Sequence, residues 1–258
     1  MIKIVFLGSK EVGAACFQHL LSQAKKLNIE VIGVLTNNRK LSAENNSTSV
    51  ASLAEKHQIT ILKSQEDLFH LEEQIDLLLS VQYHEILAAK TLQLAQKAAI
   101  NLHMAPLPDY RGCNQFSFAI IDQAKEFGTT LHLMTPGIDD GHIIAEKRWP
   151  LADDITVSDL YNKTLQESIE LFERSLETIV TGDLNPVPQE HYNKIRPSHF
   201  HLRNEITALK EINLAWSDEK IDRYVRATYF PPFDPPYAIK NGKKIALSLN
   251  WKEDLACA

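Results

Sequence analysis

The sequence predicts an α/β fold built on a mostly parallel sheet, followed by a small C-terminal region made of a helix and a β-hairpin. Short apolar runs rich in β-branched residues alternate with stretches of helical periodicity up to about residue 150, and this order is typical of parallel sheets covered by helices. A long amphipathic stretch follows. Near the C-terminus, Asn241-Gly242 separates two strand-like pieces, which strongly indicates a hairpin.

The first part of the chain supplies the elements of that sheet. Strands are predicted from short apolar runs at residues 2–7, 31–36, 59–61, 75–81, 98–102 and 129–134. Helices are predicted between them from apolar residues three or four positions apart, at residues 12–27, 50–57 and 87–96. Residues 37–48 are polar and are predicted to form a loop. Because ligands of such sheets bind beyond the carboxyl ends of the strands, residues at those ends are the first candidates for a site.

The longest predicted element is a helix between residues 156 and 182. Thr156, with Asp159 three positions later, resembles a capping box. Apolar residues then recur at steps of three or four as far as Ile179, and Gly182 marks the end of the helix. The apolar stripe predicts packing against the core and no chemistry.

The remainder of the chain divides into two further parts. Prolines 186, 188 and 197 indicate a linker. Ser217 is predicted to cap a helix that runs to about Ala227, and a proline-rich, aromatic stretch at residues 230–238 leads into the hairpin. We therefore predict a large domain at residues 1–183, a linker at 184–203 and a small C-terminal region at 204–258.

The composition is that of an ordinary globular protein, with 44% hydrophobic and 23% charged residues among 258. No apolar run reaches the length of about 18 residues that a membrane span needs, and the N-terminus lacks the pattern of a secretory signal. Cys16, Cys113 and Cys257 are too few and too scattered for a disulfide framework or a zinc site. We therefore expect a cytoplasmic protein with no bound metal.

The charge distribution argues against a nucleic-acid surface. The net charge is -6. Residues 183–258 hold 11 Lys and Arg against 10 Asp and Glu, which leaves 16 against 23 for residues 1–182. Neither part has the excess of positive charge that captures a polyphosphate.

Three polar residues with complementary chemistry close or follow predicted strands. Asn101 and His103 lie at the end of the strand near residue 102, and Asp139 follows 36 residues after His103. An amide can donate to a developing oxyanion, an imidazole can stabilise the same charge and move a proton, and a carboxylate can accept a proton from an attacking amine. Each residue alone is most often a turn former or a structural side chain, so the joint pattern carries the prediction.

The motifs around these residues resemble those of the folate-dependent formyltransferases. That group includes methionyl-tRNA formyltransferase, glycinamide ribonucleotide formyltransferase and the nucleotide-sugar N-formyltransferases. The resemblance covers roughly residues 1–180 and lies in Asn101-Leu102-His103, in the loop from Leu107 to Gly112, and in Asp139-Asp140-Gly141. It implies the Rossmann-like sheet of the formyltransferase fold. It also implies transfer of a formyl group from 10-formyltetrahydrofolate to a primary amine.

The resemblance assigns roles to individual residues. Asn101 would donate to the oxyanion, and His103 would donate to it and pass a proton to the leaving nitrogen. Asp139 would orient His103 and accept the proton that the amine loses. The predicted folate contacts are Ser80, Gln82, Tyr83, His84, Ile86, Leu87, Gly137 and Asp140. The predicted acceptor contacts are Met104, Tyr110, Arg111, Gly112, Asn114 and Gln115.

Several of these residues also have a plain structural interpretation. Tyr83 and His84 equally fit the polar surface of a loop, and Arg111 equally fits a brace for its own loop. Residues 8–13 only weakly resemble a phosphate-binding loop, because the full glycine fingerprint is missing, and they are predicted to form a simple strand-to-helix turn.

The identity of the acceptor is open. The tRNA enzymes usually have a longer chain with a basic C-terminal domain, and the glycinamide ribonucleotide enzyme is typically shorter. The proline-rich, aromatic tail of this chain resembles that of the sugar N-formyltransferases, which favours a dTDP- or UDP-linked amino sugar. The resemblance further implies a role in synthesis of a surface polysaccharide such as lipopolysaccharide, and a homodimer. The alternatives are methionyl-tRNA formyltransferase, another folate-dependent formyl transfer, hydrolysis of formyltetrahydrofolate, and a non-catalytic folate-binding relative.

Overall fold

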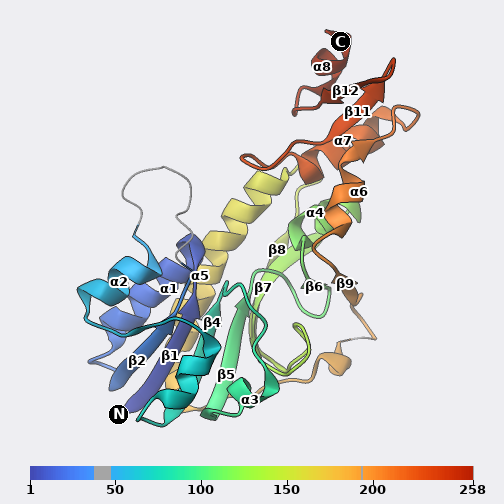
Figure 1. Cartoon of the computed structure of the whole chain (residues 1–258). Coiled ribbons are helices and arrows are strands. Elements are labelled where there is room, and N and C mark those ends of the chain that lie inside the picture. The colour runs from blue at the N-terminus through green and yellow to red at the C-terminus, as the bar shows by residue number, and fades with distance from the viewer. Residues whose placement is uncertain (38–47, 193, 258) are drawn as a thin grey trace.

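A seven-stranded sheet forms the centre of the computed structural model, which describes residues 1–37, 48–192 and 194–257 (Figure 1). The strand order is β3-β2-β1-β4-β5-β7-β8. The strands are β1 (Ile2–Gly8), β2 (Ile29–Leu35), β3 (Ile61–Leu62), β4 (Ile75–Val81), β5 (Ala95–His103), β7 (Glu126–Leu133) and β8 (Ile143–Pro150). Neighbours from β3 to β5 are parallel, whereas β7 and β8 are antiparallel additions beyond β5. The prediction of a mostly parallel α/β sheet is therefore confirmed.

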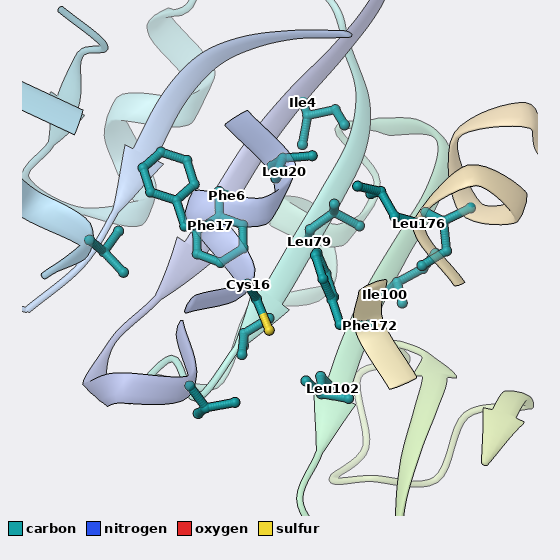
Figure 2. Close-up of a cluster of buried hydrophobic side chains, with 14 of the residues drawn as sticks. Ile4, Phe6, Cys16, Phe17, Leu20, Leu79, Ile100, Leu102, Phe172 and Leu176 are labelled. Atoms are coloured by element: carbon teal, nitrogen blue, oxygen red, sulfur yellow. The ribbon is translucent and has the colours of Figure 1, made fainter. Parts of the chain in front are cut away.

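Successive side chains of a strand point to opposite faces of a sheet, and in this sheet the side chains on both faces are buried. On one face, Ile4 and Phe6 of β1 pack in a core with α1 (Lys10–Gln23), α2 (Val50–Lys56) and α5 (Val157–Thr181). The rings of Phe6 and Phe17 stack with centroids 4.8 Å apart (Figure 2). On the other face, Val5 and Leu7 pack with residues of η1 (Gln65–His70) and the loop before α3 (Ala89–Leu92). Burying each such large side chain stabilises the fold by about 1.5–3 kcal/mol.

The long helix α5 has the ends that its sequence predicts. The Thr156 hydroxyl oxygen accepts the backbone N–H of Asp159 at 3.1 Å, and its own hydrogen is donated to the Asp159 carboxylate at 2.6 Å. Gly182 follows the last turn with φ of 78°, a left-handed conformation that glycine adopts without strain. The helix crosses the sheet and contacts both α1 and β7.

The chain returns to the sheet after α5. It forms η2 (Gln189–His191) and β9 (His199–His201), and β9 pairs in parallel with β6 (Tyr110–Gly112). The segment predicted as a linker thus contributes a strand beside the motif-bearing loop.

The C-terminal region has a small core of its own. Its elements are α6 (Glu205–Leu209), β10 (Glu211–Ile212), α7 (Asp218–Thr228), β11 (Tyr237–Lys240), β12 (Lys243–Ala246) and α8 (Trp251–Ala256). Ser217 caps α7, and Asn241 and Gly242 turn the hairpin with φ of 51° and 75°, so the predicted helix and hairpin are confirmed. The region lies at the opposite end of the molecule from the N-terminus (Figure 1), and α7 packs against α4 (Gln115–Ile121).

One local prediction is wrong. The periodicity predicts a helix at residues 87–96, but α3 is only four residues long and β5 already begins at Ala95. Ala95 pairs with Ile75 of β4, and this pairing along the sheet outweighs a weak local periodicity. The polar loop expected at residues 37–48 falls almost entirely outside the described residues. Within the described part of the chain, no helix combines the length and the apolar character that crossing a membrane requires.

Candidate active site

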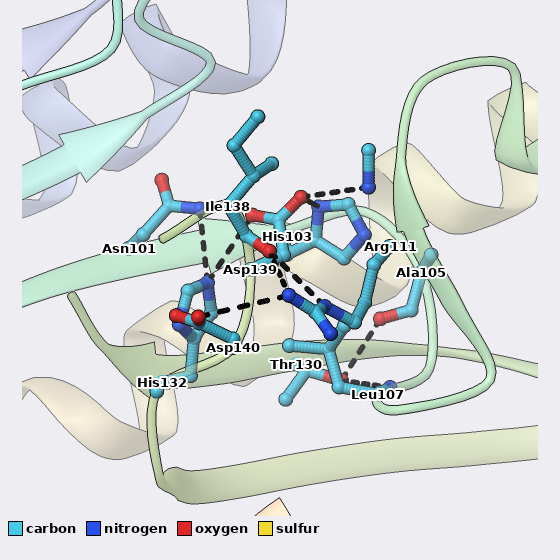
Figure 3. A network of polar contacts seen from close by, with 12 residues as sticks. Asn101, His103, Ala105, Leu107, Arg111, Thr130, His132, Ile138, Asp139 and Asp140 are labelled. Carbon is cyan, nitrogen blue, oxygen red and sulfur yellow. Dashed lines mark hydrogen bonds and ion pairs between the residues drawn. The ribbon is translucent and has the colours of Figure 1, made fainter. Parts of the chain in front are cut away.

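The three polar residues singled out in the sequence lie together at the end of β5 (Figure 3). Asn101 and His103 are on β5, and Asp139 is in the loop that joins β7 to β8. The strand β5 is held between β4 and β7, where Asn101 pairs with Ser80 on one side and with His132 on the other. The Asp139 carboxylate lies 3.6 Å from the His103 ring. The sheet topology thus brings together residues that are far apart in the chain.

His103 is buried, with 6% of its surface exposed, and both of its ring nitrogens face protein groups. Nε2 donates to the Tyr110 carbonyl at 2.8 Å, and Nδ1 faces Asp139 Oδ2 at 3.6 Å. Because a backbone carbonyl can only accept, this bond fixes a proton on Nε2. In this arrangement His103 contacts Asp139 and is not itself part of the cleft wall described below.

Asp139 is an ionised carboxylate in a partly enclosed position. Burial opposes its ionisation, but the His103 and His132 rings and the backbone N–H of Gly112 stabilise the charge, and together they hold the pKa of Asp139 well below its usual range. The Gly112 N–H donates to Oδ2 at 3.0 Å, and His132 Nε2 lies 3.6 Å from Oδ1. Asp139 also has a φ of 50°, which is uncommon for a residue with a side chain.

Asn101 has a neighbour that aims its amide. Its Nδ2 lies 3.2 Å from Nε2 of His132, whose Nδ1 donates to the Leu133 carbonyl at 2.8 Å. His132 Nε2 also faces Asp139 Oδ1 at 3.6 Å, so the neutral ring accepts one N–H of the Asn101 amide, whereas the protonated ring donates to the carboxylate. The second N–H of Asn101 remains available to the cleft, which Asn101 lines.

Arg111 braces the loop that carries Asp139. Its Nε and Nη2 both donate to the Ile138 carbonyl, at 3.0 and 2.8 Å, and Nη2 lies 3.7 Å from the Asp140 carboxylate (Figure 3). Asp140 also accepts the Thr135 hydroxyl. The contacts of Arg111 therefore fit its interpretation as a loop brace, because the guanidinium contacts the Ile138 carbonyl and the Asp140 carboxylate of the protein itself.

Two glycines of the motifs are required by close backbone approaches. Gly112 has a φ of +85°, and a Cβ there would lie 2.3 Å from the His201 carbonyl oxygen. A Cβ at Gly141 would lie 1.8 Å from the Leu133 carbonyl oxygen. Both glycines let neighbouring strands close around Asp139.

A cleft of about 400 Å³ opens over Asn101 and Asp139. Of the residues predicted to contact folate, Ser80, Tyr83, His84, Ile86, Leu87 and Gly137 line it. Gln82 and Asp140 do not; the Gln82 side-chain oxygen instead accepts from the Lys10 amine at 3.1 Å. Its volume lies within the range of about 300–1,000 Å³ that is typical of small-molecule sites. The cleft is therefore large enough for one substituted ring system.

Of the residues predicted to contact the acceptor, only Gly112 lines this cleft. Met104 and Tyr110 are 1% and 4% exposed and pack in the core. The Asn114 amide donates to the carbonyls of Leu202 and Arg203, and Gln115 begins α4. The residues predicted to contact the acceptor do not line one common cleft in this structure, and their role stays a prediction.

The sequence prediction missed several residues that lie at the site. His132 could have been found, because a polar residue inside an apolar strand next to the aspartate loop is a recognisable pattern. The others have no signal in the local sequence. Gln189, Phe200, His201 and Arg203 reach the site only because the chain returns after α5. No cluster of three or more His, Cys, Asp or Glu residues suited to a metal ion occurs in residues 1–37, 48–192 and 194–257.

Comparison with known proteins places this geometry in a family. The model of the formyl transferase family matches residues 2–176. GDP-perosamine N-formyltransferase of Brucella melitensis is 29% identical over 168 residues, which cover 65% of this chain and 62%, less than two thirds, of that protein. Methionyl-tRNA formyltransferase of Halalkalibacterium halodurans is 28% identical over 267 residues, covering 99% of this chain and 79% of that protein.

Solved structures share the fold. The sugar 3N-formyltransferase WlaRD, solved with dTDP and 5-N-formyl-THF, has a TM-score of 0.77 and 26% identity, covering 95% of this chain and 85% of that one. An N-formyltransferase from Helicobacter canadensis, solved with folinic acid and dTDP-3-aminofucose, has a TM-score of 0.77 and 24% identity, covering 95% and 86%. With the family model matching well over half of its length, this chain belongs to the formyl transferase family.

Proposed function

We propose that this protein transfers the formyl group of 10-formyltetrahydrofolate to the amino group of a nucleotide-linked amino sugar. One observation supports the proposal above all others. A free amide N–H on Asn101 and an ionised carboxylate on Asp139 line the same cleft. An acyl transfer to an amine needs a donor for the oxyanion and an acceptor for the proton, and both are present.

The cleft suits a folate ring. Tyr83, Ile86, Leu87 and Met134 give it apolar surface, while Ser80, His84 and Glu85 give it polar groups. This combination of apolar walls and a few polar groups is typical of sites for planar heterocycles. Folate enters the proposed reaction as a substrate.

The reaction follows from the roles of these side chains. The acceptor amine attacks the formyl carbon, so a C–N bond forms and the carbonyl oxygen takes up the electron pair. The free Asn101 N–H stabilises that oxyanion. Asp139 accepts the proton that the amine loses, directly or through a water molecule. The C–N bond to the folate then breaks, and the departing nitrogen takes a proton as the carbonyl reforms.

His103 holds the carboxylate that accepts the proton. With Nε2 bound to the Tyr110 carbonyl, its Nδ1 side faces Asp139. In its neutral form the ring can take up through Nδ1 a proton that reaches Asp139, and the proton returns through Asp139 to the leaving nitrogen, because His103 does not line the cleft. This is compatible with the predicted role of His103 in proton transfer, whereas direct contact of His103 with the oxyanion would need the Tyr110 bond to open.

The amino-sugar acceptor is supported by the relatives and by charge. The similar proteins include a GDP-perosamine N-formyltransferase and two structures solved with dTDP or a dTDP-amino sugar. The C-terminal part of this chain is nearly neutral, with 11 basic against 10 acidic residues, and tRNA binding depends on an excess of positive charge. Methionyl-tRNA formyltransferase is the second candidate, because a relative of that name aligns with 99% of this chain.

The decisive experiment supplies the purified protein with 10-formyltetrahydrofolate and one amine at a time. The amines are dTDP-, UDP- and GDP-linked amino sugars and methionyl initiator tRNA, and one reaction contains no amine. Mass spectrometry that finds an N-formylated nucleotide sugar supports the proposal. Formylated methionyl-tRNA as the sole product favours the second candidate, and release of formate without any amine identifies a hydrolase. Folate binding without turnover on any amine refutes catalysis.

A thermal-shift screen with 5-formyltetrahydrofolate narrows the choice of nucleotide. A nucleotide sugar present at 100 times its dissociation constant adds about 2.7 kcal/mol of stability. The wider proposal includes a cytoplasmic location, a homodimer and a product destined for surface polysaccharide. Size-exclusion chromatography with light scattering tests the homodimer.

A further inference from the structure

Gln189 lies outside the part of the chain that matches the family model, yet it contacts the aspartate loop. Its side-chain Nε2 donates to the Asp139 carbonyl at 2.9 Å and to the Gly141 carbonyl at 2.8 Å. The residue is 6% exposed. Both hydrogens of one buried amide group are thus committed to carbonyls on either side of Asp140.

The surrounding backbone places Gln189 firmly. Val187 and Ile143 exchange two backbone hydrogen bonds, each of 2.8 Å, at the start of β8. Pro188 precedes the short helix that begins at Gln189. The chain after α5 is therefore fastened to the sheet immediately before Gln189, so its amide is held in position at low entropic cost.

The aspartate loop needs such support because its backbone is not in a relaxed conformation. Asp139 has a φ of 50°, which a residue with a Cβ keeps only when surrounding contacts over-determine it. Arg111 holds the Ile138 carbonyl, and Gln189 holds those of Asp139 and Gly141. The two side chains come from different parts of the chain and grip the loop on both sides of the carboxylate.

We propose that Gln189 is a positioning residue that sets the Asp139 carboxylate between His103, His132 and the Gly112 N–H. Its catalytic consequence rests on the proposed function, since only there does Asp139 accept a proton. Gln189 does not line the cleft, so it acts through the backbone of the loop. A misplacement on the order of 1 Å can cost about 10²-fold in rate.

The charged and titratable groups around Asp139 fix the expected pH effect. His103 on β5 and His132 on β7 face its oxygens, and Asp140 and Arg111 lie beside it on the same loop and on β6. The two imidazoles and the Gly112 N–H depress the pKa of Asp139. If the loop relaxes, these contacts lengthen and the pKa rises towards its ordinary value of about 4. The base form is then lost at a higher pH.

The test compares Gln189→Glu and Gln189→Ala with the wild type. Gln189→Glu keeps the size of the side chain but puts an oxygen where Nε2 donates, so it remains informative if the alanine variant folds poorly. The ¹³C shift of the Asp139 carboxyl is followed by NMR from neutral pH to about pH 3. We expect a flat signal in the wild type and a titration in both variants. This readout needs no substrate and holds even if no formyl transfer is found.

Kinetics and two control variants complete the design. We expect kcat to fall roughly 10- to 10²-fold in both Gln189 variants, with KM for folate unchanged. Glu190→Gln alters the exposed neighbour on the same turn, and Ile221→Ala removes a buried side chain from the C-terminal core; neither should change the Asp139 titration. An unchanged carboxyl signal in both Gln189 variants overturns the proposal, and so does the same titration in Ile221→Ala, which would indicate a general loss of stability.

Discussion

Two walls of the cleft differ in how firmly they are held. In the wall at residues 135–139, Arg111 and Gln189 hold the backbone, and the Asp139 side chain accepts the Gly112 N–H. In the wall at residues 83–87, Ile86 is 67% exposed, and Tyr83 and His84 have Glu85 as a side-chain partner, at 3.0 and 3.5 Å. The groups assigned to chemistry are fixed, and the groups assigned to binding keep contacts that solvent also reaches.

This difference matches the demands of the two tasks. A proton acceptor must stay within a few tenths of an ångström of its productive position, because rate falls steeply with misplacement. A binding wall has to close around a ring after the ring arrives, and loosely held side chains can do so. Substitutions in the fixed wall should therefore change kcat, whereas substitutions in the open wall should change KM.

The largest effect is expected from Asn101→Ala. Loss of the oxyanion donor should lower kcat by about 10²–10³-fold and leave KM for folate within a few-fold, since one such donor typically contributes this much. Steady-state kinetics with the best acceptor measures it. Asn250→Ala, at the start of α8 in the C-terminal region, is the matched control and should retain wild-type turnover. Near-normal kcat in Asn101→Ala would contradict the role of oxyanion donor assigned to Asn101.

The next effect concerns the stability that Asp139 contributes. Its folded-state pKa is depressed, so its carboxylate stabilises the fold above the unfolded pKa of about 4 and loses that contribution as the pH falls towards the folded value. Relative to Asp139→Asn, the wild type should lose about 1 kcal/mol between neutral pH and about pH 3, because each pH unit below the unfolded pKa costs about 1.4 kcal/mol. Urea denaturation at a series of pH values checks this. Parallel stability curves for the two proteins would show that the carboxylate has no net stabilising partners.

The open wall should respond to Ile86→Ser. Folate binding would cover part of this exposed side chain, so the loss of apolar contact should raise KM for folate about 5- to 10-fold and leave kcat unchanged. Ile195→Ser is a suitable control, because Ile195 is 77% exposed and does not line the cleft. A fall in kcat with unchanged KM would erase the distinction between the walls.

The smallest effect is expected far from both walls. Gly182 has a φ of +78° at the end of α5, and among the described residues none but its chain neighbours comes within 4 Å of the position that a Cβ would take there. Gly182→Ala should therefore lower the free energy of unfolding by about 1 kcal/mol through backbone strain alone. Thermal denaturation measures the loss, and kcat and KM should not change. A change in either kinetic constant would mean that helix α5 transmits strain to the cleft.

Local patterns were sufficient for much of the fold. The strands of the parallel sheet, the cap of α5 at Thr156 and the Asn241-Gly242 turn each depend on a few neighbouring residues, and the structure has all of them. The convergence of Asn101, His103 and Asp139 was predicted from their joint pattern and not from strand order, because β7 is antiparallel to β5 and its carboxyl end lies beside Ile100. Their catalytic roles stay predictions.

Other features depend on contacts that no local pattern encodes. The start of β5 at Ala95 is decided by its pairing with Ile75. Arg111 donates to the Ile138 carbonyl, 27 residues away, and this contact can be predicted only if the position of that loop is known. Gln189 has no periodicity or motif around it, and its importance appears only when the chain returns to the sheet.

The parallel pairing of β6 with β9 has a consequence for biogenesis. The Asn114 amide meets the Leu202 carbonyl across 88 residues of sequence, and closing so long a loop is slow compared with forming a helix or hairpin. A polypeptide that ended after the region matching the family, at residues 2–176, would contain every signature motif. It would lack strand β9, which pairs with β6 beside these motifs. The pairing of β6 can therefore be completed only after His201 has been synthesised.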